Sequence, residues 1–306
     1  MGERSDFMDN ENMDRPVSVL ICTRNRPASL SRLLSQLRNA SNEFNQLVVV
    51  DSSDPQFFPQ VDSVMGDNTP LFQGHKITYI HTSTPSLTHQ KNLGLGVIPP
   101  NSLVQILDDD VLPPIGYISH MKRTLLNLGL IGVSGITQEL SIPGAARRNF
   151  GRFFGLFGPA SGKVSAAGIG TPFFPQMQTG QSIRKSDWLI GCSMWDLIKL
   201  GNLKFAEEFV GSALFEDVEF STRAAKRGQM AVDLSKTLYH ASAPEERPDP
   251  FTYWFRFSRN RFEVITLVSK FPSFILLWST LGVTLQILFG RQDQKFKLPT
   301  ESLTPL

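Results

Sequence analysis

Cysteine is scarce in this sequence, which contains only Cys22 and Cys192 among its 306 residues. Neither cysteine lies in a Cys-x-x-Cys pair or in a cysteine–histidine spacing, so nothing indicates a structural zinc site. Cys22 stands within an apolar run and is expected in the core. This sparing use of cysteine favours a reducing, cytosolic environment.

A strong charge of one sign is also absent, since 30 lysines and arginines stand against 28 aspartates and glutamates. The net charge of +2 does not require nucleic acid as a partner, and we expect none. Residues 1–15 are polar and acidic and contain no apolar stretch behind a basic start. They are therefore expected to form a disordered lead-in and not a secretory signal. The sequence contains no internal repeat. The length of the chain suits one large domain or two modest ones.

Short apolar runs alternate regularly with helical patterns along the first half of the chain. The run at 17–22 predicts a buried strand and the run at 47–50 a second one, with a leucine-rich helix between them. The leucines that share the helix face are Leu30, Leu33, Leu34 and Leu37, and Pro27 stands near the helix start. Further strands are expected at 77–80, 103–107 and 130–136, and further helices at 87–95 and 114–128. This order predicts an α/β fold whose ligands bind at the carboxyl ends of parallel strands.

The periodic pattern is lost between residues 141 and 185. This stretch is rich in glycine, proline and phenylalanine and carries Arg147, Arg148 and Arg152. A long irregular segment inside a compact domain usually has a function, so we interpret 141–187 as an irregular insertion that forms a functional loop or lid.

Three adjacent carboxylates, Asp108, Asp109 and Asp110, directly follow the predicted strand at 103–107. Their mutual repulsion would raise at least one pKa, and a divalent cation would remove that cost. Oxygen ligands suit Mg²⁺ or Mn²⁺, which commonly share their coordination shell with substrate phosphates. The alternative is a solvated acidic turn or a helix cap. The position at a strand's carboxyl end, followed by two prolines, favours the metal site.

Other candidate residues each have a structural alternative. Asp51, which ends the second strand, could bind a base or ribose or could form an Asx-type turn. Glu216 and Asp217 open a helix, where a carboxylate could act as a general base or could only oppose the helix dipole. His240 follows a strand expected at 230–234 and could be a third metal ligand or an ordinary surface or core residue.

Six motifs resemble those of family 2 glycosyltransferases with the GT-A fold, and they keep the family's order between about residues 17 and 240. They are Thr-Arg-Asn-Arg-Pro at 23–27, Val-Asp-Ser-Ser at 50–53, Gln-Lys-Asn-Leu-Gly-Leu at 90–95, Leu-Asp-Asp-Asp-Val-Leu-Pro at 107–113, Gly-Cys-Ser-Met at 191–194 with Leu-Gly at 200–201, and Glu-Asp-Val-Glu-Phe-Ser-Thr-Arg at 216–223. The family often has Asp-Asp-Gly-Ser where this chain has Asp-Ser-Ser-Asp, and often arginine in place of Lys91. Segment 141–185 has no firm counterpart.

The resemblance implies a Rossmann-like, mostly parallel sheet flanked by helices over residues 16–245, and an inverting transfer of a sugar to an acceptor hydroxyl. It implies Mg²⁺ or Mn²⁺ held by Asp108, Asp110 and His240, with Asp217 as the base and Glu216 as the alternative base. Nucleotide-sugar contacts are implied for Thr23, Arg24, Asp51, Lys91, Asp108 and Asp109. Acceptor contacts are implied for Trp188, Gly191, Cys192 and Ser193, although a core position for Trp188 is nearly as well supported.

The implied sugar is a hexose or deoxyhexose carried by UDP or dTDP, and the implied acceptor is a glycan or a lipid-linked molecule of polysaccharide or glycolipid synthesis. One alternative is a sugar-phosphate nucleotidyltransferase, whose fold is related. It would need a glycine-rich phosphate loop near the first strand, and the sequence has none there. The other is a catalytically silent, membrane-associated protein that binds nucleotide-sugars, which the presence of Asp110 and Asp217 argues against.

The C-terminal segment 246–306 is expected to be a basic and hydrophobic helical extension. Residues 271–289 contain no charge, and basic residues flank them on both sides. This run is close to the minimum for a spanning helix, and it could also lie on an anionic membrane surface or pack in a core or a homo-oligomer interface. We expect the protein in the cytoplasm, at the inner face of a membrane.

Overall fold

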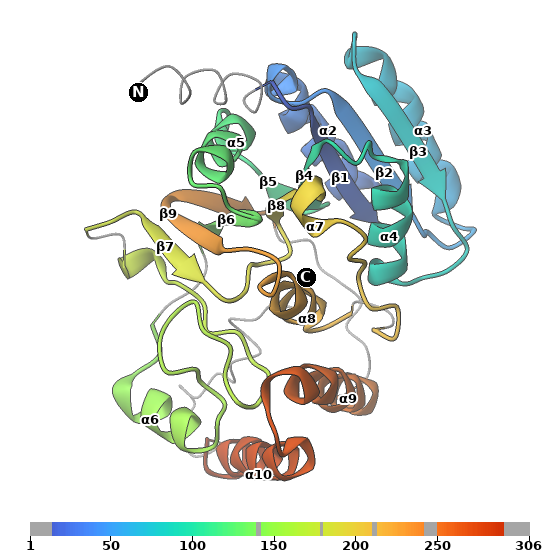
Figure 1. Cartoon of the computed structure of the whole chain (residues 1–306). Coiled ribbons are helices and arrows are strands. Elements are labelled where there is room, and N and C mark those ends of the chain that lie inside the picture. Colours follow the sequence, from blue (N-terminus) through green and yellow to red (C-terminus); the bar gives the residue numbers. More distant parts are fainter. Residues whose placement is uncertain (1–13, 139–141, 178–179, 210–212, 242–249, 291–306) are drawn as a thin grey trace, which may run out of the picture.

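One mixed sheet forms the centre of the computed structural model, which describes residues 14–290 apart from 139–141, 178–179, 210–212 and 242–249 (Figure 1). The strand order is β3-β2-β1-β4-β8-β6-β9-β5, with β7 paired to β9. Four strands at one side are parallel: β1 (Val17–Thr23), β2 (Gln46–Asp51), β3 (Lys76–His81) and β4 (Leu103–Asp108). Every residue of β1 and β2 is buried, as their unbroken apolar runs predicted.

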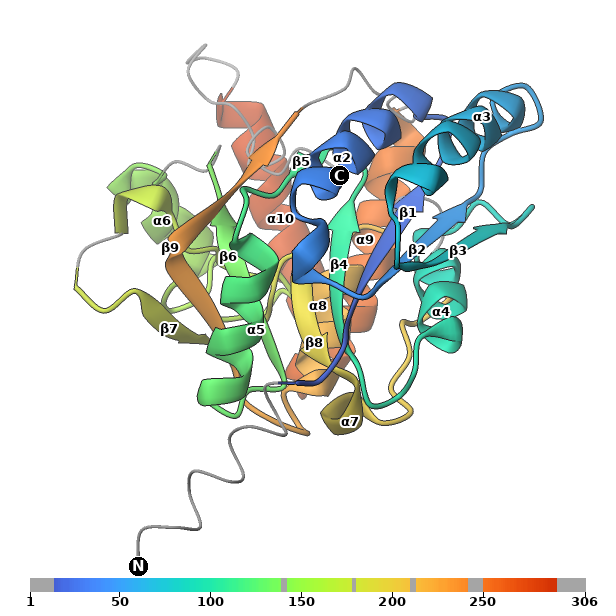
Figure 2. The ribbon, with the colours of Figure 1, turned by 90° about the horizontal axis from the view of Figure 1, so that it is seen from above.

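Helices cover both faces of this parallel half (Figure 2). Alternate residues of a strand point to opposite faces, so Val19 and Val49 belong to one apolar cluster while Leu20 and Val48 belong to another. The first cluster receives side chains from α2 (Pro27–Asn39), α3 (Phe58–Asn68) and α5 (Tyr117–Asn127), and the second from α4 (Leu87–Val97) and α8 (Glu216–Ala224). The four leucines predicted for one face of α2 are all fully buried.

The second half of the sheet reverses direction. β8 (Ser193–Asp196) runs antiparallel to both β4 and β6 (Gly132–Thr137), and β6 runs parallel to β9. The strand expected at 230–234 extends further, because β9 (Met230–His240) continues to pair with β5 (Val111–Leu112). The short helix α7 (Leu197–Leu200) follows β8. The result is the mixed α/β architecture that the sequence predicted.

The segment expected to be irregular contains regular structure. It holds α6 (Ala145–Phe153), β7 (Ile183–Ser186) and a short 3-10 turn at Pro175–Met177. Phe150, Phe153 and Phe154 are spaced by three and four residues, so they share one helix face, and their rings meet each other and Trp278. This helix was not predicted from the sequence, because the residue that it packs against, Trp278, lies more than a hundred residues away in the chain.

Two helices end the described chain: α9 (Pro250–Val268) and α10 (Pro272–Gly290). They pack on each other, and α9 also packs on α8. The helical extension expected there is therefore present, although its residues 246–249 and 291–306 lie outside the described ones, as do residues 1–13 of the expected lead-in. Within the described residues, we find no helix that combines the length and apolarity needed to cross a membrane.

Candidate active site

The carboxyl ends of β1, β2 and β4 meet at one edge of the sheet. The register aligns Thr23 with Asp51, and Asp108 ends the strand on the other side of β1. From α4, the Nε2 of Gln90 donates hydrogen bonds to the carbonyl oxygens of Thr23 at 2.9 Å and Val50 at 2.8 Å. This buried amide fixes the spacing of two strand ends, so three distant segments of the sequence form one rigid edge.

Two carboxylates of the acidic triplet share one cation, Arg26. Its Nη1 lies 2.9 Å from an oxygen of Asp109 and 3.1 Å from an oxygen of Asp110. Asp109 also accepts a hydrogen bond from Thr23 Oγ1 at 2.6 Å. Burial raises the pKa of Asp109 to about 6, although Arg26 and Thr23 favour its charged form. The raised pKa that the sequence predicted within the triplet is therefore present, and burial is its main cause.

Arg26 is a candidate site residue that was not predicted from the sequence. The residue predicted from this loop was Arg24. Asn25 between them has a positive φ of 58°, which turns the chain sharply. As a result Arg24 forms a surface pair with Asp54 at 3.1 Å, while Arg26 reaches the acidic triplet. The asparagine between the two arginines could have indicated that their side chains point in different directions, since asparagine tolerates a positive φ. The predicted nucleotide contact of Arg24 stays a prediction.

His240 lies beside Asp110, as its predicted role requires. β5 pairs with the end of β9, and the backbone N–H of Ala241 donates to the carbonyl oxygen of Asp110 at 2.7 Å. His240 Nδ1 is 3.8 Å from Asp110 Oδ1, a buried oxygen that has no hydrogen-bond partner among the described residues. Asp108, however, accepts a hydrogen bond from the Cys192 thiol at 3.1 Å. Among the residues described, no group of three or more histidine, cysteine, aspartate or glutamate side chains is arranged to hold a metal ion.

Lys91 and Glu216 form a buried ion pair beneath this edge. Lys91 Nζ is 2.6 Å from Glu216 Oε1, and the two residues are 1% and 6% exposed. Burial alone would lower the pKa of Lys91, but the carboxylates of Glu216 and Asp108 outweigh it and raise that pKa. Glu216 Oε2 is buried and, within the part of the chain that the structure describes, has no hydrogen-bond partner. The pair connects α4 to the start of α8, so it positions the helix that carries Asp217.

Asp217 has an environment that favours its protonated form. Burial first, and then the charge of Glu216, raise its pKa from an ordinary 3.8 to about 7. One carboxylate oxygen accepts a hydrogen bond from the backbone N–H of Val218 at 2.8 Å. The turn before α8 is strained, since Ala213 and Phe215 have φ values of 51° and 70°. Such backbone outliers commonly mark functional sites, and a carboxyl with a pKa near neutrality can exchange protons at physiological pH.

The four residues predicted to face the acceptor do not all present their side chains openly. Trp188 is 7% exposed, belongs to an apolar cluster beside α8, and donates from Nε1 to the carbonyl oxygen of Thr171 at 3.4 Å. Ser193 is 2% exposed and accepts a hydrogen bond from another tryptophan. Cys192 contacts Asp108, and burial raises its thiol pKa, so the thiol stays protonated. Gly191 is buried. Their acceptor role remains a prediction.

Asp51 forms the Asx-type turn that was its structural alternative. Its Oδ1 accepts from the backbone N–H of Ser53 at 2.8 Å, and its Oδ2 accepts from the Tyr79 hydroxyl at 3.1 Å. His81 Nδ1 lies 3.5 Å from the same Oδ2, and Asp51 is 0% exposed. Its side chain therefore joins the carboxyl ends of β2 and β3. Its contact with a nucleotide stays a prediction.

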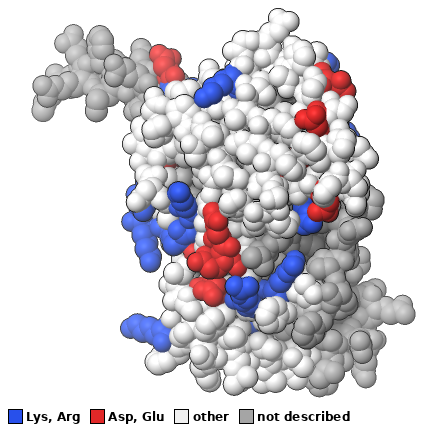
Figure 3. Space-filling model, turned by 90° about the vertical axis from the view of Figure 1, so that its right-hand side faces the viewer, with Lys and Arg blue, Asp and Glu red and all other residues white. Residues whose placement is uncertain are grey.

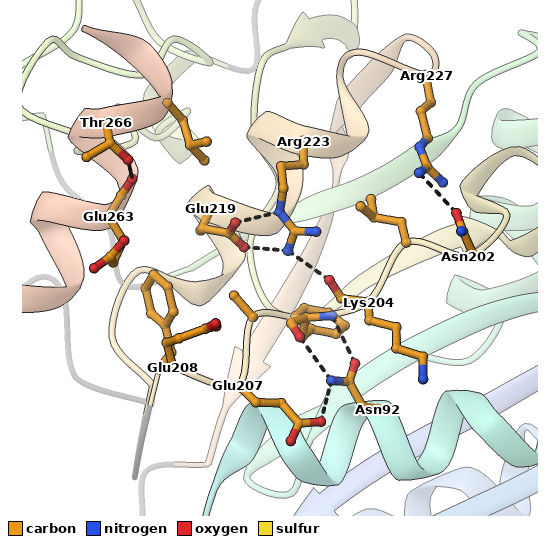
Figure 4. Close-up of a pocket in the computed structure, with 15 residues that line it drawn as sticks. Asn92, Asn202, Lys204, Glu207, Glu208, Glu219, Arg223, Arg227, Glu263 and Thr266 are labelled. Atoms are coloured by element: carbon orange, nitrogen blue, oxygen red, sulfur yellow. Dashed lines mark hydrogen bonds and ion pairs between the residues drawn. The ribbon is translucent and has the colours of Figure 1, made fainter.

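A cavity of about 710 Å³ lies apart from these residues and is lined by none of the predicted ones. The 202–209 loop, α4, α8 and α9 surround it (Figure 4). Some of its polar groups contact each other: Arg223 pairs with Glu219, and the Asn92 side chain joins Phe205 and Glu207. From the side of this loop, acidic side chains gather in one patch with basic side chains beside it (Figure 3). The contacts of Arg223 and Asn92 join the elements that surround the cavity.

Comparison with known proteins gives no matching family profile and no matching curated protein. Among solved structures, the chain is similar to S. aureus TarS 1–349 in complex with UDP-GlcNAc, at 14% identity and a TM-score of 0.54, over 94% of this chain and 77% of that chain. It is also similar to GalNAc-T7 with UDP, GalNAc and Mn²⁺, at 14% identity and a TM-score of 0.58, over 77% of this chain and 45% of that chain. At these identities the likeness shows the fold alone, which is the GT-A fold of glycosyltransferases.

Proposed function

We propose that the chain is a glycosyltransferase that moves a sugar from a nucleotide diphosphate, UDP or dTDP, to an acceptor hydroxyl. One observation carries the proposal. Asp217, with a pKa of about 7, begins a helix that the buried Lys91–Glu216 pair holds at the sheet edge where GT-A folds bind nucleotide-sugars. In support, the similar TarS structure contains UDP-GlcNAc.

Asp217 acts as the general base in this proposal. Its ionised carboxylate takes the acceptor's proton while the acceptor oxygen attacks the anomeric carbon and the bond to the diphosphate breaks, so the configuration inverts. Glu216 is less suited to this role, because its Oε1 is held by Lys91 at 2.6 Å. Such assistance is worth roughly 10²–10⁴-fold in rate. The sugar is a hexose or deoxyhexose, and the acceptor is a glycan or lipid-linked molecule.

One basic side chain favours the diphosphate directly. Arg26 lies on the acidic triplet and is partly exposed, so it can turn toward phosphate oxygens. Lys91 is fully buried and its charge is matched by that of Glu216, so the pair positions α8 and the contact of Lys91 with the nucleotide-sugar stays a prediction. Arg26 is thus placed to attract the nucleotide diphosphate and to stabilise the charge that grows on it as it leaves.

The residues near Asp110 also suit a divalent cation. The unpartnered, buried Asp110 Oδ1 and the nearby His240 Nδ1 are ligand types that Mg²⁺ or Mn²⁺ accepts, and Asp108 is the remaining carboxylate. One or two protein carboxylates with substrate phosphates are the usual shell for such an ion. When bound, the ion supplies neutralising charge for the leaving diphosphate. The similar GalNAc-T7 structure contains Mn²⁺.

The test is a screen of UDP- and dTDP-sugars for release of the nucleoside diphosphate, with Mg²⁺, with Mn²⁺ and with excess chelator. We expect release with at least one nucleotide-sugar, faster with a metal ion and slowed in Asp217→Asn. Release of pyrophosphate instead of a nucleoside diphosphate would assign the chain to nucleotidyl transfer. Tight binding of a nucleotide-sugar without turnover would assign it to a silent binding protein.

A further inference from the structure

α10 exposes large apolar side chains that a helix covering a core would bury. They are Phe271, directly before the helix, at 72%, and Phe274 at 63%, Leu277 at 73% and Leu281 at 45%. They are spaced by three or four residues, so they form one stripe along the helix. The side that faces the protein is mixed: Ser279 is 0% and Gln286 5% exposed, and Ile275, Val283 and Leu285 pack against Phe154 and Leu156. A helix with this arrangement is suited to an apolar environment outside the protein.

Protein contacts beside this stripe hold α10 in this orientation. Trp278 Nε1 donates to the carbonyl oxygen of Phe153 at 3.0 Å, and Arg261, on α9, donates to Thr280 Oγ1 at 3.1 Å. Gly282 lies so close to Phe154 that an added Cβ would be 2.4 Å from its ring. The outward direction of the stripe is therefore fixed by packing on α6 and α9 (Figure 1).

Aromatic rings extend the stripe beyond α10. Phe153, at the end of α6, is 67% exposed, and its ring centroid is 5.3 Å from that of Trp278. The Phe274 ring also stacks with that of Trp278, with ring centroids 6.4 Å apart and an interplanar angle of 8°. We name as the outer aromatic face Phe153, Phe271, Phe274, Leu277, Trp278 and Leu281. Phenylalanine, leucine and tryptophan are the residues that insert into the boundary between headgroups and acyl chains.

Basic residues concentrate in the segments that carry this face. Residues 142–153 and 250–286 contain seven lysines and arginines and one acidic residue, Glu263, whereas the whole chain has 30 and 28. Arg152, Arg259 and Lys270 are exposed. A basic surface next to an apolar stripe matches an anionic bilayer. A second copy is a poorer match, because a two-fold interface through this face would bring like charges together.

We propose that the outer aromatic face binds an anionic lipid surface, with α10 lying in the plane of the interface. The inference goes beyond the proposed function and does not depend on it. Lipid binding would bring the candidate active site close to the membrane, because α9 lies between α10 and the start of α8. Phe257, on α9, packs against Phe215 at 5.1 Å, and Asn260 Nδ2 donates to the carbonyl oxygen of Leu214 at 3.1 Å. The residues preceding Asp217 are thus one helix away from the lipid surface.

The test is cosedimentation of the full chain, without nucleotide-sugar, with two kinds of vesicle. One is phosphatidylcholine alone, and the other contains phosphatidylglycerol as about one third of the lipid. We expect binding to the anionic vesicles that weakens with added salt, and weaker binding to the neutral ones. Replacing Phe274→Ser and Leu277→Ser together should weaken binding by at least roughly tenfold, because two large apolar side chains are lost from the buried area.

The matched control replaces Ile115→Ser and Ile198→Ser, which are 68% and 60% exposed elsewhere on the surface. This variant should bind as the parent does, and circular dichroism checks that both variants fold. Absence of binding to anionic vesicles at low salt would overturn the proposal, as would equal binding by the Phe274/Leu277 variant. A dimer in light scattering that dissociates in that variant would assign the face to a second copy.

Discussion

The molecule has two acidic centres at the same sheet edge, and they differ in how their charge is compensated. After β4, Asp109 and Asp110 share Arg26, and Asp109 also accepts from Thr23. At the start of α8, Glu216 holds the Lys91 cation at 2.6 Å, and among the described residues no ion pair joins Asp217 to a cation.

This difference teaches how one edge can support two kinds of chemistry. A carboxylate beside a cation is suited to binding charged groups, and a carboxylate with a pKa near 7 is suited to moving a proton. We therefore propose that the centre after β4 binds the diphosphate and a divalent ion, and that the centre at α8 takes the acceptor's proton. The following changes test this division of roles.

The largest effect is expected from Asp110→Ala. This change removes the buried carboxylate nearest His240, so turnover should fall by roughly 10³-fold or more if a divalent ion is needed there. The measurement is release of nucleoside diphosphate over a Mn²⁺ titration. Asp54→Ala, which removes a surface carboxylate paired with Arg24, is the control and should keep most activity. Full activity of Asp110→Ala, or of the parent in excess chelator, contradicts the metal assignment.

Asp217→Asn keeps the shape of the side chain and removes its basicity. We expect kcat to fall by roughly 10²–10⁴-fold with the KM for the nucleotide-sugar nearly unchanged, because the diphosphate is held at the other centre. Steady-state kinetics measure both constants. Glu216→Gln should reduce kcat less. If Glu216→Gln is the inactive variant and Asp217→Asn remains active, the two roles are exchanged, and if both remain active the base lies elsewhere.

Lys91→Met should reduce stability more than activity at the other centre. It leaves the Glu216 carboxyl buried at 6% exposure without its cation. Breaking a buried pair in this way costs about 3–5 kcal/mol in the free energy of unfolding. Urea unfolding measures the loss. The double variant Lys91→Met with Glu216→Gln removes the orphaned charge and should recover part of the stability. Equal loss in the single and double variants would mean that the pair contributes through packing alone.

The parallel half of the fold could be predicted from sequence because its signals are local. The run at 17–22, the four leucines of α2 and the acidic triplet each lie within a few residues, and the structure has each element where the pattern indicated. By contrast, α6 was missed because Phe150 and Phe154 pack against α10, far away in the chain.

For the candidate site, the sequence indicated residue types but not their pairing. It named Asp108, Lys91 and Glu216 as candidates without indicating that Lys91 and Glu216 touch, since 125 residues separate them. It chose Arg24 instead of Arg26, because the direction of each side chain depends on the backbone turn at Asn25. Contacts across the sheet edge are set by register, which a single sequence does not encode locally.

The pH dependence of turnover separates the two centres further. Because the carboxyl of Asp217 has a pKa of about 7, it is protonated at lower pH and cannot accept a proton. We expect kcat to fall about tenfold per pH unit below that value and to level above it. The profile is measured at saturating nucleotide-sugar with fixed metal ion. A profile that stays flat from about pH 5 to pH 8 would contradict Asp217 as the base.

The smallest expected effect is on stability, and it follows from the same pKa. In the folded protein Asp217 holds its proton up to a pH of about 7, whereas its ordinary pKa is 3.8. Between these values the folded state binds more protons than the unfolded state, so the free energy of unfolding decreases as the pH rises. Above pH 7 the ionised carboxylate remains partly buried next to Glu216. The free-energy cost of holding its charge there is then fully present.

Asp217→Asn removes that cost and should therefore stabilise the protein at pH 8 but hardly at pH 4. We expect about 1 kcal/mol at pH 8, allowing for the solvent that reaches the carboxylate, or a Tm higher by about 2–4 °C. Asp54→Asn is a control of opposite sign. Hydrogen bonds from Asn25 and Arg24 lower the pKa of Asp54, so its charged form stabilises the fold and the variant should be less stable than the parent at pH 8. Thermal unfolding at both pH values measures the two differences. If Asp217→Asn were less stable than the parent at pH 8, the carboxylate would be a stabilising charge like that of Asp54, and the contrast between the two acidic centres would be lost.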